Sequence, residues 1–263
     1  MRMNKDAILK KLEALSGNIG VTILEGTGDE LHFGGDLPIE AASVIKLPIM
    51  GTAFKAAAEG RLNLDDVVET DSREMMPGCG VITRLHAGLK LTIRDLIVLM
   101  IIVSDNTATN MMIDILGIEA VNRFIDSEGL KNTRLRRKMF DAESAARGII
   151  NTVSSDDMAV LLDKICKGKL VSAEASAEML SILDEQQLNG KIPFYLSHND
   201  DPDLDIDSAH KTGEDDGITH DVGILFTEPP MVFCFLSEHT HVPETVQAIQ
   251  TLARDLVYPD TGC

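Results

Sequence analysis

Strand-like segments near both ends of the chain, with a long helical region between them, restrict its fold more than any other feature. Alternating or β-branched stretches occur at residues 18–24 and 30–34, and again at 208–213, 220–226 and 231–237. The pattern between about residue 43 and residue 185 is helical. Because strands need partners, we expect the two groups of strands to pair into a single sheet.

Helices are predicted at both ends as well. Apolar residues at helical spacing indicate a helix within residues 5–15 and a final helix that starts near Pro243. The predicted fold is therefore α/β (α+β): an antiparallel sheet, flanked by N- and C-terminal helices, with an inserted all-α lobe. We assign one domain, in which the α/β lobe spans about 1–40 and 186–263 and the helical lobe about 41–185.

Charge and cysteine usage limit the partners. A net charge of −18 disfavours binding to nucleic acid or to an anionic membrane surface. The N-terminal sequence lacks a secretory signal and the four cysteines are scattered, which is typical of reduced cytoplasmic thiols. A periplasmic or secreted location is the alternative if a signal has been removed. No typical metal or nucleotide motif is present, so we expect neither metal nor cofactor, and the oligomeric state stays open.

The first polar motif lies in the apolar stretch "EAASVIKLPIM", which contains Ser43 and Lys46. In a helix that starts near Ser43, residues i and i+3 share a face, so the amine could reach the hydroxyl. A serine hydroxyl becomes a good nucleophile only when a base takes its proton, and burial can lower the pKa of a lysine enough for that role. A helix-capping serine and a solvent-reaching lysine are the structural alternative.

The second motif ends a buried helix. Residues 96–103 are apolar throughout, and the run stops at Ser104, Asp105 and Asn106. Polar groups at the end of a buried helix must be hydrogen-bonded or must line a cavity. A simple cap that connects to the next helix explains the same residues.

The third motif, Lys211, Thr212 and Gly213, lies on the first strand of the C-terminal group, where a glycine permits close approach of a ligand. Taken alone, a solvated edge lysine explains it as well. However, S-x-x-K, S-D-N and K-T-G occur together in this order, which is the signature of class A β-lactamases and penicillin-binding proteins. From about residue 5 to the C-terminal helix, the sequence resembles the class A β-lactamase family, as a divergent member.

The resemblance implies catalytic roles for four of these residues. Ser43 would be the acylated nucleophile and Lys46 its base or proton relay. Ser104 would pass a proton to the leaving nitrogen, and Asn106 would bind the amide side chain of the substrate.

It also implies a substrate-binding strand. Lys211 and Thr212, followed by Gly213, would hold a substrate carboxylate, and the backbone N–H groups of Ser43 and Glu214 would form the oxyanion hole. The family places an arginine on the next strand to help hold that carboxylate. This sequence has none there, and His220 is the nearest candidate.

A surface loop departs from the family pattern. Counting from Arg137, the position of the water-activating glutamate is occupied by Met139, which cannot accept a proton. We favour Asp141 over Glu143 as the substitute base, because it is nearer to the expected position. Asn151 stands where the family has an aspartate that binds the arginine. Deacylation is thus the step that the sequence leaves open.

The sequence therefore predicts a serine hydrolase that acts on a small-molecule substrate through a covalent acyl-enzyme. Amide hydrolysis in a β-lactam, the activity behind antibiotic resistance, is the leading interpretation. A D,D-peptidase or a small-ester hydrolase is the alternative, as is a penicillin-binding module that is acylated without turnover.

Overall fold

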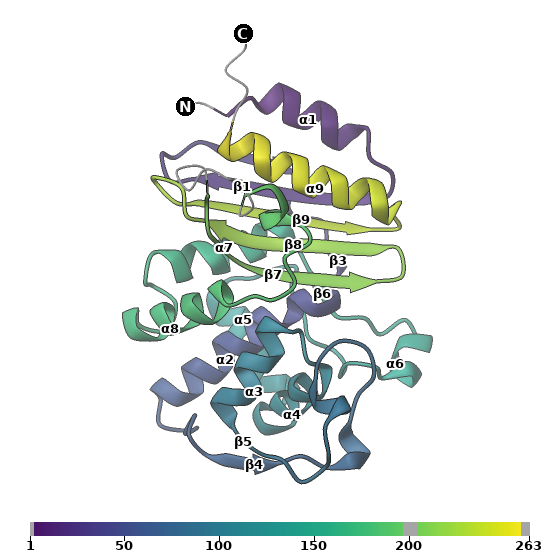
Figure 1. Cartoon of the computed structure of the whole chain (residues 1–263), viewed down its shortest axis with the longest axis vertical. Coiled ribbons are helices and arrows are strands. Elements are labelled where there is room, and N and C mark those ends of the chain that lie inside the picture. Colours follow the sequence, from purple (N-terminus) through teal and green to yellow (C-terminus); the bar gives the residue numbers. More distant parts are fainter. Residues whose placement is uncertain (1–2, 197–204, 259–263) are drawn as a thin grey trace.

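The computed structural model describes residues 3–196 and 205–258, and in it both ends of the chain meet in one sheet (Figure 1). The five antiparallel strands have the order β2-β1-β9-β8-β7. Their bounds are β1 Asn18–Glu25, β2 Glu30–Phe33, β7 Ser208–Asp215, β8 Ile218–Leu225 and β9 Met231–Glu238. Strand β1 pairs with β9 over its whole length, from Asn18 opposite Glu238 to Glu25 opposite Met231. The predicted α/β fold is confirmed.

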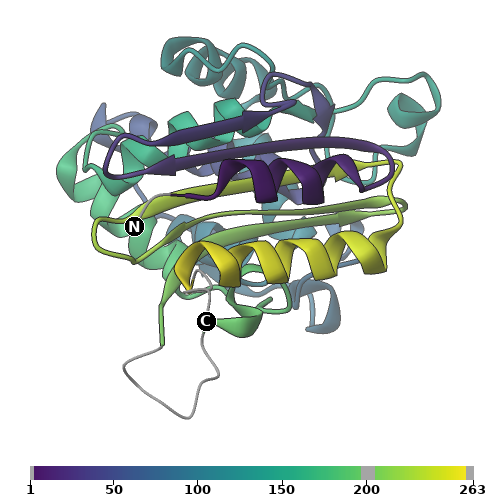
Figure 2. The ribbon, with the colours of Figure 1, turned by 90° about the horizontal axis from the view of Figure 1, so that it is seen from above.

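Two helices cover one face of this sheet, α1 (Lys5–Glu13) and α9 (Val242–Val257), and they lie side by side in both views (Figures 1 and 2). Each is amphipathic, and each buries apolar residues against the strands. The buried residues are Ile8, Leu12, Ile249, Leu252 and Ala253. An ion pair between Lys11 and Asp255 links the exposed sides of the two helices.

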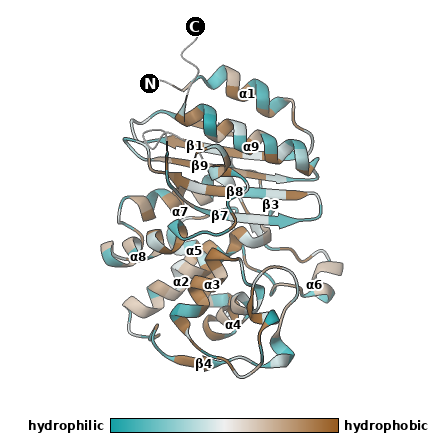
Figure 3. Cartoon of the chain, in the orientation of Figure 1, coloured by the Kyte–Doolittle hydropathy of each residue, from teal (hydrophilic) through white to brown (hydrophobic). Residues whose placement is uncertain are grey.

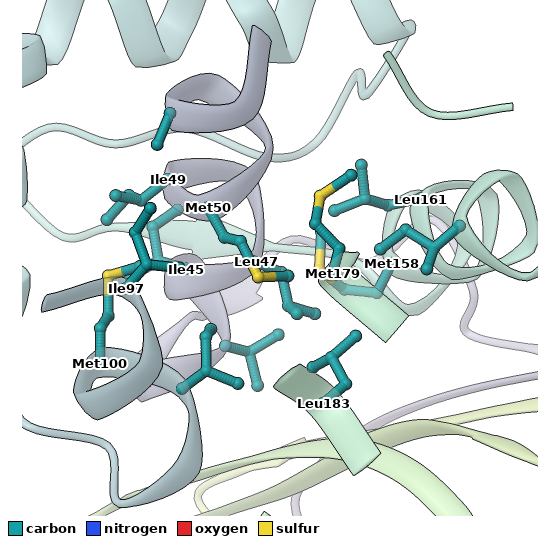
Figure 4. Close-up of a cluster of buried hydrophobic side chains, with 14 of the residues drawn as sticks. Ile45, Leu47, Ile49, Met50, Ile97, Met100, Met158, Leu161, Met179 and Leu183 are labelled. Carbon is teal, nitrogen blue, oxygen red and sulfur yellow. The ribbon is translucent and has the colours of Figure 1, made fainter. Parts of the chain in front are cut away.

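The opposite face carries the remaining long helices. These are α2 Lys46–Ala58, α3 Ile93–Ile102, α4 Asn106–Leu116, α5 Ile118–Glu128, α7 Ser155–Cys166 and α8 Ala173–Asp184. Helices α2 and α3 are coloured as largely hydrophobic in Figure 3. Labelled side chains of α2, α3, α7 and α8 point toward one another in Figure 4, among them Met50, Met100 and Met179. One core therefore extends from these helices to the sheet.

Short strands also occur outside the five-stranded sheet, at residues 39–40 just before the predicted helical region and at residues 67–69, 90–92 and 152–153 within it. Strand β3 (Ile39–Glu40) pairs with β6 (Thr152–Val153), and β4 (Val67–Glu69) pairs with β5 (Lys90–Thr92). Two or three residues are too few to show an alternating pattern, so the sequence analysis did not predict these short strands. The β3–β6 pair brings the chain just before Ser43 next to the surface loop.

The start of α3 is fixed by interactions between residues close together in the chain. The Thr92 hydroxyl accepts a hydrogen bond from the Asp95 N–H (3.0 Å), and the Asp95 carboxylate accepts one from the Thr92 N–H (2.8 Å). This capping box fixes where α3 begins, and the buried apolar residues of the helix extend from Ile93 to Ile101. The S-D-N motif follows directly, at the buried end of the helix.

Residues 3–196 and 205–258 contain no helix that is both long and apolar enough to cross a membrane. Cys79, Cys166 and Cys234 are free thiols. Cys263, the fourth cysteine expected to be reduced, lies outside the described residues.

Candidate active site

The three motifs meet at the hydroxyl of Ser104. Its Oγ accepts a hydrogen bond from Nζ of Lys46 (2.9 Å) and another from Nζ of Lys211 (3.1 Å). Ser104 is almost fully buried and has a φ of 54°, in the left-handed region that non-glycine residues seldom adopt. Such strain persists where the surrounding structure fixes it, often at functional sites. One hydroxyl thus joins S-x-x-K, S-D-N and K-T-G.

Lys46 is fully buried and directs its amine toward the S-D-N motif. Nζ donates to the carbonyl oxygen of Ser104 (2.8 Å), to the Ser104 Oγ, and to Oδ1 of Asn106 (2.9 Å). Burial, and then the neighbouring charge of Lys211, lower the pKa of Lys46 well below its usual value. These causes favour the neutral amine, which has the lone pair that a base needs.

Ser43 lies in the 3-10 turn η1 (Ala42–Ile45), which leads into α2, and is half-buried. The backbone is strained where this turn begins, because Ala42 has a φ of 41°. The predicted reach of the Lys46 amine to the Ser43 hydroxyl is not made as a hydrogen bond, since all three ammonium protons have acceptors in Ser104 and Asn106. A neutral Lys46 would have to release one of these to receive a proton from Ser43.

Asp105 fixes a loop over the site. One carboxylate oxygen caps α4 at the Ala108 N–H (3.0 Å), and the other accepts from the N–H groups of Val81 (2.7 Å) and Ile82 (2.9 Å). A Cβ at Gly80 would lie 2.3 Å from this carboxylate, so only glycine fits there. The hydrogen bond to Ala108 is the helix cap that the sequence analysis gave as the alternative for this motif, whereas the contacts with Val81 and Ile82 were not predicted.

The K-T-G motif lies on β7, the edge strand next to η1. Lys211 is fully buried and also donates to the Thr212 carbonyl oxygen (2.8 Å). Burial lowers the pKa of Lys211 to about 7, although the charge of Asp221 opposes the shift. A Cβ at Gly213 would lie 2.9 Å from Cδ2 of His220 and 3.2 Å from Cγ2 of Val44. Gly213 therefore lets η1 pack closely against β7.

His220 is fully buried opposite Gly213 and is used within the protein. Its Nε2 donates to the Glu40 carbonyl oxygen (2.8 Å), and its Nδ1 accepts from the Ser237 N–H (3.0 Å). Burial lowers the pKa of His220 to about 4, so the ring is neutral at pH 7. This geometry argues against the carboxylate-binding role that we expected, because no charge and no free donor remain.

Asn110 holds the surface loop that contains Met139 in place. Its Oδ1 accepts from the Met139 N–H (2.8 Å), and its Nδ2 donates to the Met139 carbonyl oxygen (3.0 Å). The Met139 side chain packs against the apolar core. Asn110 was missed by the sequence analysis, although it lies one helical turn after Asn106 on the same face of α4.

Asn151 closes the neck of the loop with its side-chain amide. Its Oδ1 accepts from the N–H groups of Arg136 (2.7 Å) and Arg137 (3.0 Å), and its Nδ2 donates to the Arg137 carbonyl oxygen (3.1 Å). The Arg137 guanidinium instead pairs with Glu40 (3.3 Å). Hydrogen bonds between the Asn151 side chain and the backbone thus stand where the family has an aspartate–arginine ion pair.

A cavity of about 280 Å³ lies between this loop and β7. It is lined by Glu40, Ala42, Arg137, Met139, Phe140, Asp141, Ala142, Ala145, Asn151 and Asp215. Of the two acids that we considered on the loop, Asp141 lines the cavity and the exposed Glu143 does not. Asp141 caps helix α6 (Ala142–Ala146) by accepting from the Ser144 N–H (3.0 Å), and this hydrogen bond lowers its pKa. A lowered pKa makes Asp141 a weak base.

Replacing Asn151 with alanine is expected to lower the free energy of unfolding by about 2 kcal/mol, because partly buried N–H and carbonyl groups at Arg136 and Arg137 lose their partner. Urea unfolding would measure this change. Asn63→Ala, at an exposed turn, is the matched control and should change stability by less than about 0.5 kcal/mol. Equal effects of the two substitutions would contradict the structural role of Asn151.

Comparison with known proteins finds similarity to one family. Residues 5–258 match the model described as the Beta-lactamase enzyme family. A β-lactamase from Rhodobacter capsulatus is 30% identical over 172 residues, which cover 64% of this chain and 58% of the relative. β-Lactamase L2 from Stenotrophomonas maltophilia is 30% identical over 179 residues, covering 67% and 56%. The chain therefore spans little more than half the length of these curated relatives.

Solved structures match over nearly the whole chain. A β-lactamase from Sphaerobacter thermophilus has a TM-score of 0.87 at 32% identity and covers 97% of both chains. PBP-A has a TM-score of 0.84 at 27% identity, covering 96% of this chain and 94% of its own. A PBP-A variant with a TM-score of 0.83 at 27% identity, covering 97% and 96%, is described as an acyl-enzyme complex with penicillin-G.

Proposed function

The chain belongs to the beta-lactamase enzyme family, and from that premise we propose that it is a serine hydrolase that forms an acyl-enzyme on Ser43. The observation that carries the proposal is the pair of hydrogen bonds to the Ser104 Oγ from Lys46 and Lys211. They place a candidate base and a candidate anion-binding cation on either side of one hydroxyl, next to the turn that holds Ser43. The leading reaction is amide hydrolysis in a β-lactam.

Acylation would begin with attack of the Ser43 Oγ on the substrate carbonyl carbon. Neutral Lys46 takes the hydroxyl proton as the carbon–oxygen bond forms. The backbone N–H groups of Ser43 and Glu214 hold the negative charge that develops on the carbonyl oxygen. As the carbon–nitrogen bond breaks, Ser104 gives its proton to the leaving nitrogen and regains one from Lys46. The amine is then neutral again, and the substrate is an ester of Ser43.

Substrate binding would use the groups around the Ser104 hydroxyl. Lys211 and Thr212 would hold a carboxylate, with Lys211 as the positive charge nearest to Ser104. Asn106 would bind an amide group of the substrate. Its hydrogen bonds with Lys46 and the Pro77 carbonyl oxygen hold its side chain in one orientation. The substrate is thus expected to be a small acyl compound.

Deacylation is expected to be slow. A water molecule must lose a proton as it attacks the ester, and Met139 offers no acceptor for it. Of the two loop carboxylates considered, Asp141 is the candidate because it lines the cavity beside the loop, but its lowered pKa makes it a poor base. A penicillin-binding module that is acylated without turnover is therefore the second candidate function. The similarity to PBP-A supports it, whereas the altered loop also suits a D,D-peptidase or a small-ester hydrolase.

Incubation with a chromogenic cephalosporin, followed by intact-mass measurement, separates these functions. Continuous colour formation supports the hydrolase, and a single-turnover burst with a stable adduct supports the binding module. The absence of both colour and adduct would contradict the proposal for β-lactams. Acyl-ester substrates would then test the remaining hydrolase activities. Turnover that survives unchanged in Asp141→Asn would exclude that residue as the deacylation base.

The pH dependence of acylation should report Lys211. Because its pKa is about 7, Lys211 loses its positive charge as the pH rises above that value. For a substrate that carries a carboxylate, kcat/KM is expected to fall above about pH 7, since this parameter reports ionisations of the free enzyme. In Lys211→Arg the cation persists at all accessible pH values, so the decline should disappear. A decline that is the same in both proteins would contradict the assignment.

A further inference from the structure

Lys191 is a buried cation beside the K-T-G strand that the proposed mechanism does not use. It is 4% exposed and immediately precedes the 3-10 turn η4 (Ile192–Tyr195). Its Nζ donates to the carbonyl oxygen of His220 (2.9 Å) and, at the longer distance of 3.4 Å, to that of Gly213. It also forms an ion pair with the Glu214 carboxylate (3.1 Å). The ammonium group therefore lies against β7 and β8, next to the K-T-G motif.

The register of β7 shows which face of the sheet Lys191 occupies. Thr212 and Glu214 project from the same face, because alternate side chains of a strand share a face. Lys191 contacts Glu214, and the next residue, Ile192, donates its N–H to Asp221, which lies opposite Thr212 (2.9 Å). Lys191 thus lies along the face that carries Thr212, the residue expected to hold a substrate carboxylate. Its charge also lowers the pKa of Lys211, in agreement with a position close to the site.

Glu214 covers this cation from the solvent side. Its side chain is 66% exposed, and it directly follows the K-T-G motif. Thr219 is opposite Glu214 in the register and fully buried, and its Oγ1 has no hydrogen-bond partner among the described residues. Buried hydroxyls are rarely left unpaired, so an unused polar group adjoins the ion pair. The strand face thus contains a buried cation, a hydroxyl without a partner among the described residues, and the exposed Glu214 carboxylate.

We propose that Lys191 is an anion-binding residue of the active site and that the Glu214 carboxylate occupies it as an internal ligand. The pair then determines specificity: a substrate with a carboxylate at this position must displace Glu214, and Asp215 and Asp216 add to the repulsion. A neutral ester or amide meets no such competition. This inference rests on the proposed function and predicts that the Lys191–Glu214 pair shifts the preference of the site toward neutral acyl compounds.

Benzylpenicillin and its methyl ester provide a test, because they differ only in the carboxylate. The measured quantity is the ratio of their acylation rate constants, anion over ester, from intact-mass time courses. Glu214→Gln is expected to raise this ratio about fivefold, the effect of about 1 kcal/mol that a partly exposed ion pair can have. Asp215→Asn removes the same charge one residue along, from the opposite face of the strand, and should raise the ratio clearly less.

A double-mutant cycle assigns the effect to Lys191. If Glu214 acts by occupying this cation, the increase in the ratio should vanish when Glu214→Gln is combined with Lys191→Gln. The proposal is overturned if Glu214→Gln leaves the ratio unchanged, if Asp215→Asn raises it equally, or if the increase persists without Lys191. Circular dichroism of each variant verifies that it is folded.

Binding to a Ser43→Ala background separates this inference from the proposed function. Calorimetry then measures the affinities for benzylpenicillin and its methyl ester without acylation. If the parent protein stays unmodified in the mass experiment, that result contradicts the acyl-enzyme proposal but not the role of the Lys191–Glu214 pair. The ratio of the two affinities should still rise about fivefold in Ser43→Ala/Glu214→Gln, and no rise would overturn the role of the Lys191–Glu214 pair.

Discussion

Replacing Ser43 with alanine is expected to abolish the covalent adduct with a β-lactam and to lower turnover by about 10⁴-fold or more. Alanine has no oxygen to attack the carbonyl, so the acyl-enzyme route is lost however well the substrate binds. Intact-mass measurement after incubation with benzylpenicillin checks the adduct, and a chromogenic cephalosporin checks turnover.

Ser208→Ala is a fitting control, because Ser208 and Lys211 form a second S-x-x-K pattern in this sequence. Ser208 begins β7, and the Lys211 amine contacts Ser104 and the Thr212 carbonyl oxygen. The adduct should therefore form in Ser208→Ala. An adduct that persists in Ser43→Ala would show that another residue is acylated and would contradict the proposed mechanism.

Replacing Met139 with glutamate should accelerate release of the acyl group by about 10²-fold, which is the usual contribution of a positioned general base. Both hydrogen bonds from Asn110 are to the backbone of Met139, so they can hold the new side chain at the same place. The measurement is the rate at which the acyl-enzyme mass disappears after excess penicillin has been removed.

Met139→Gln has almost the same shape as Met139→Glu but cannot act as a base at neutral pH, so it controls for the loss of the methionine side chain. Only the glutamate variant should release the acyl group faster. Equal rates in the two variants would mean that Met139 does not lie where the attacking water needs a base, and the interpretation of the loop would then be wrong.

Local signals explain why much of the fold was predictable. The pattern in residues 18–24 and 231–237 predicted the strands that became β1 and β9, and the capping box that starts α3 is likewise formed by residues close together in the chain. The short strands β3 to β6 escaped prediction, because their pairing depends on segments far apart in the chain. Asn110 escaped as well, because an asparagine on a helix shows its purpose only when its loop partner is known.

The site was predictable in its chemistry but not in its connections. Ser43, Lys46, Ser104 and Lys211 were selected by residue type and order. The sequence suggested a Ser43–Lys46 contact, whereas the buried amine lies against Ser104 and Asn106. His220 was selected as the nearest candidate to replace the missing arginine, but burial keeps its ring neutral and both ring nitrogens have backbone partners.

By itself, the sequence determined which reactive groups the chain has and the helices and strands on which they lie, since caps and periodicity are local properties. Only the tertiary structure decided which groups share a proton, because Lys46 and Lys211 reach Ser104 from positions 58 and 107 residues away. It also decided their pKa values, because burial and neighbouring charge, rather than residue type, shift a lysine toward the neutral form. The ion pair of Lys191 with Glu214 likewise exists only in the folded chain.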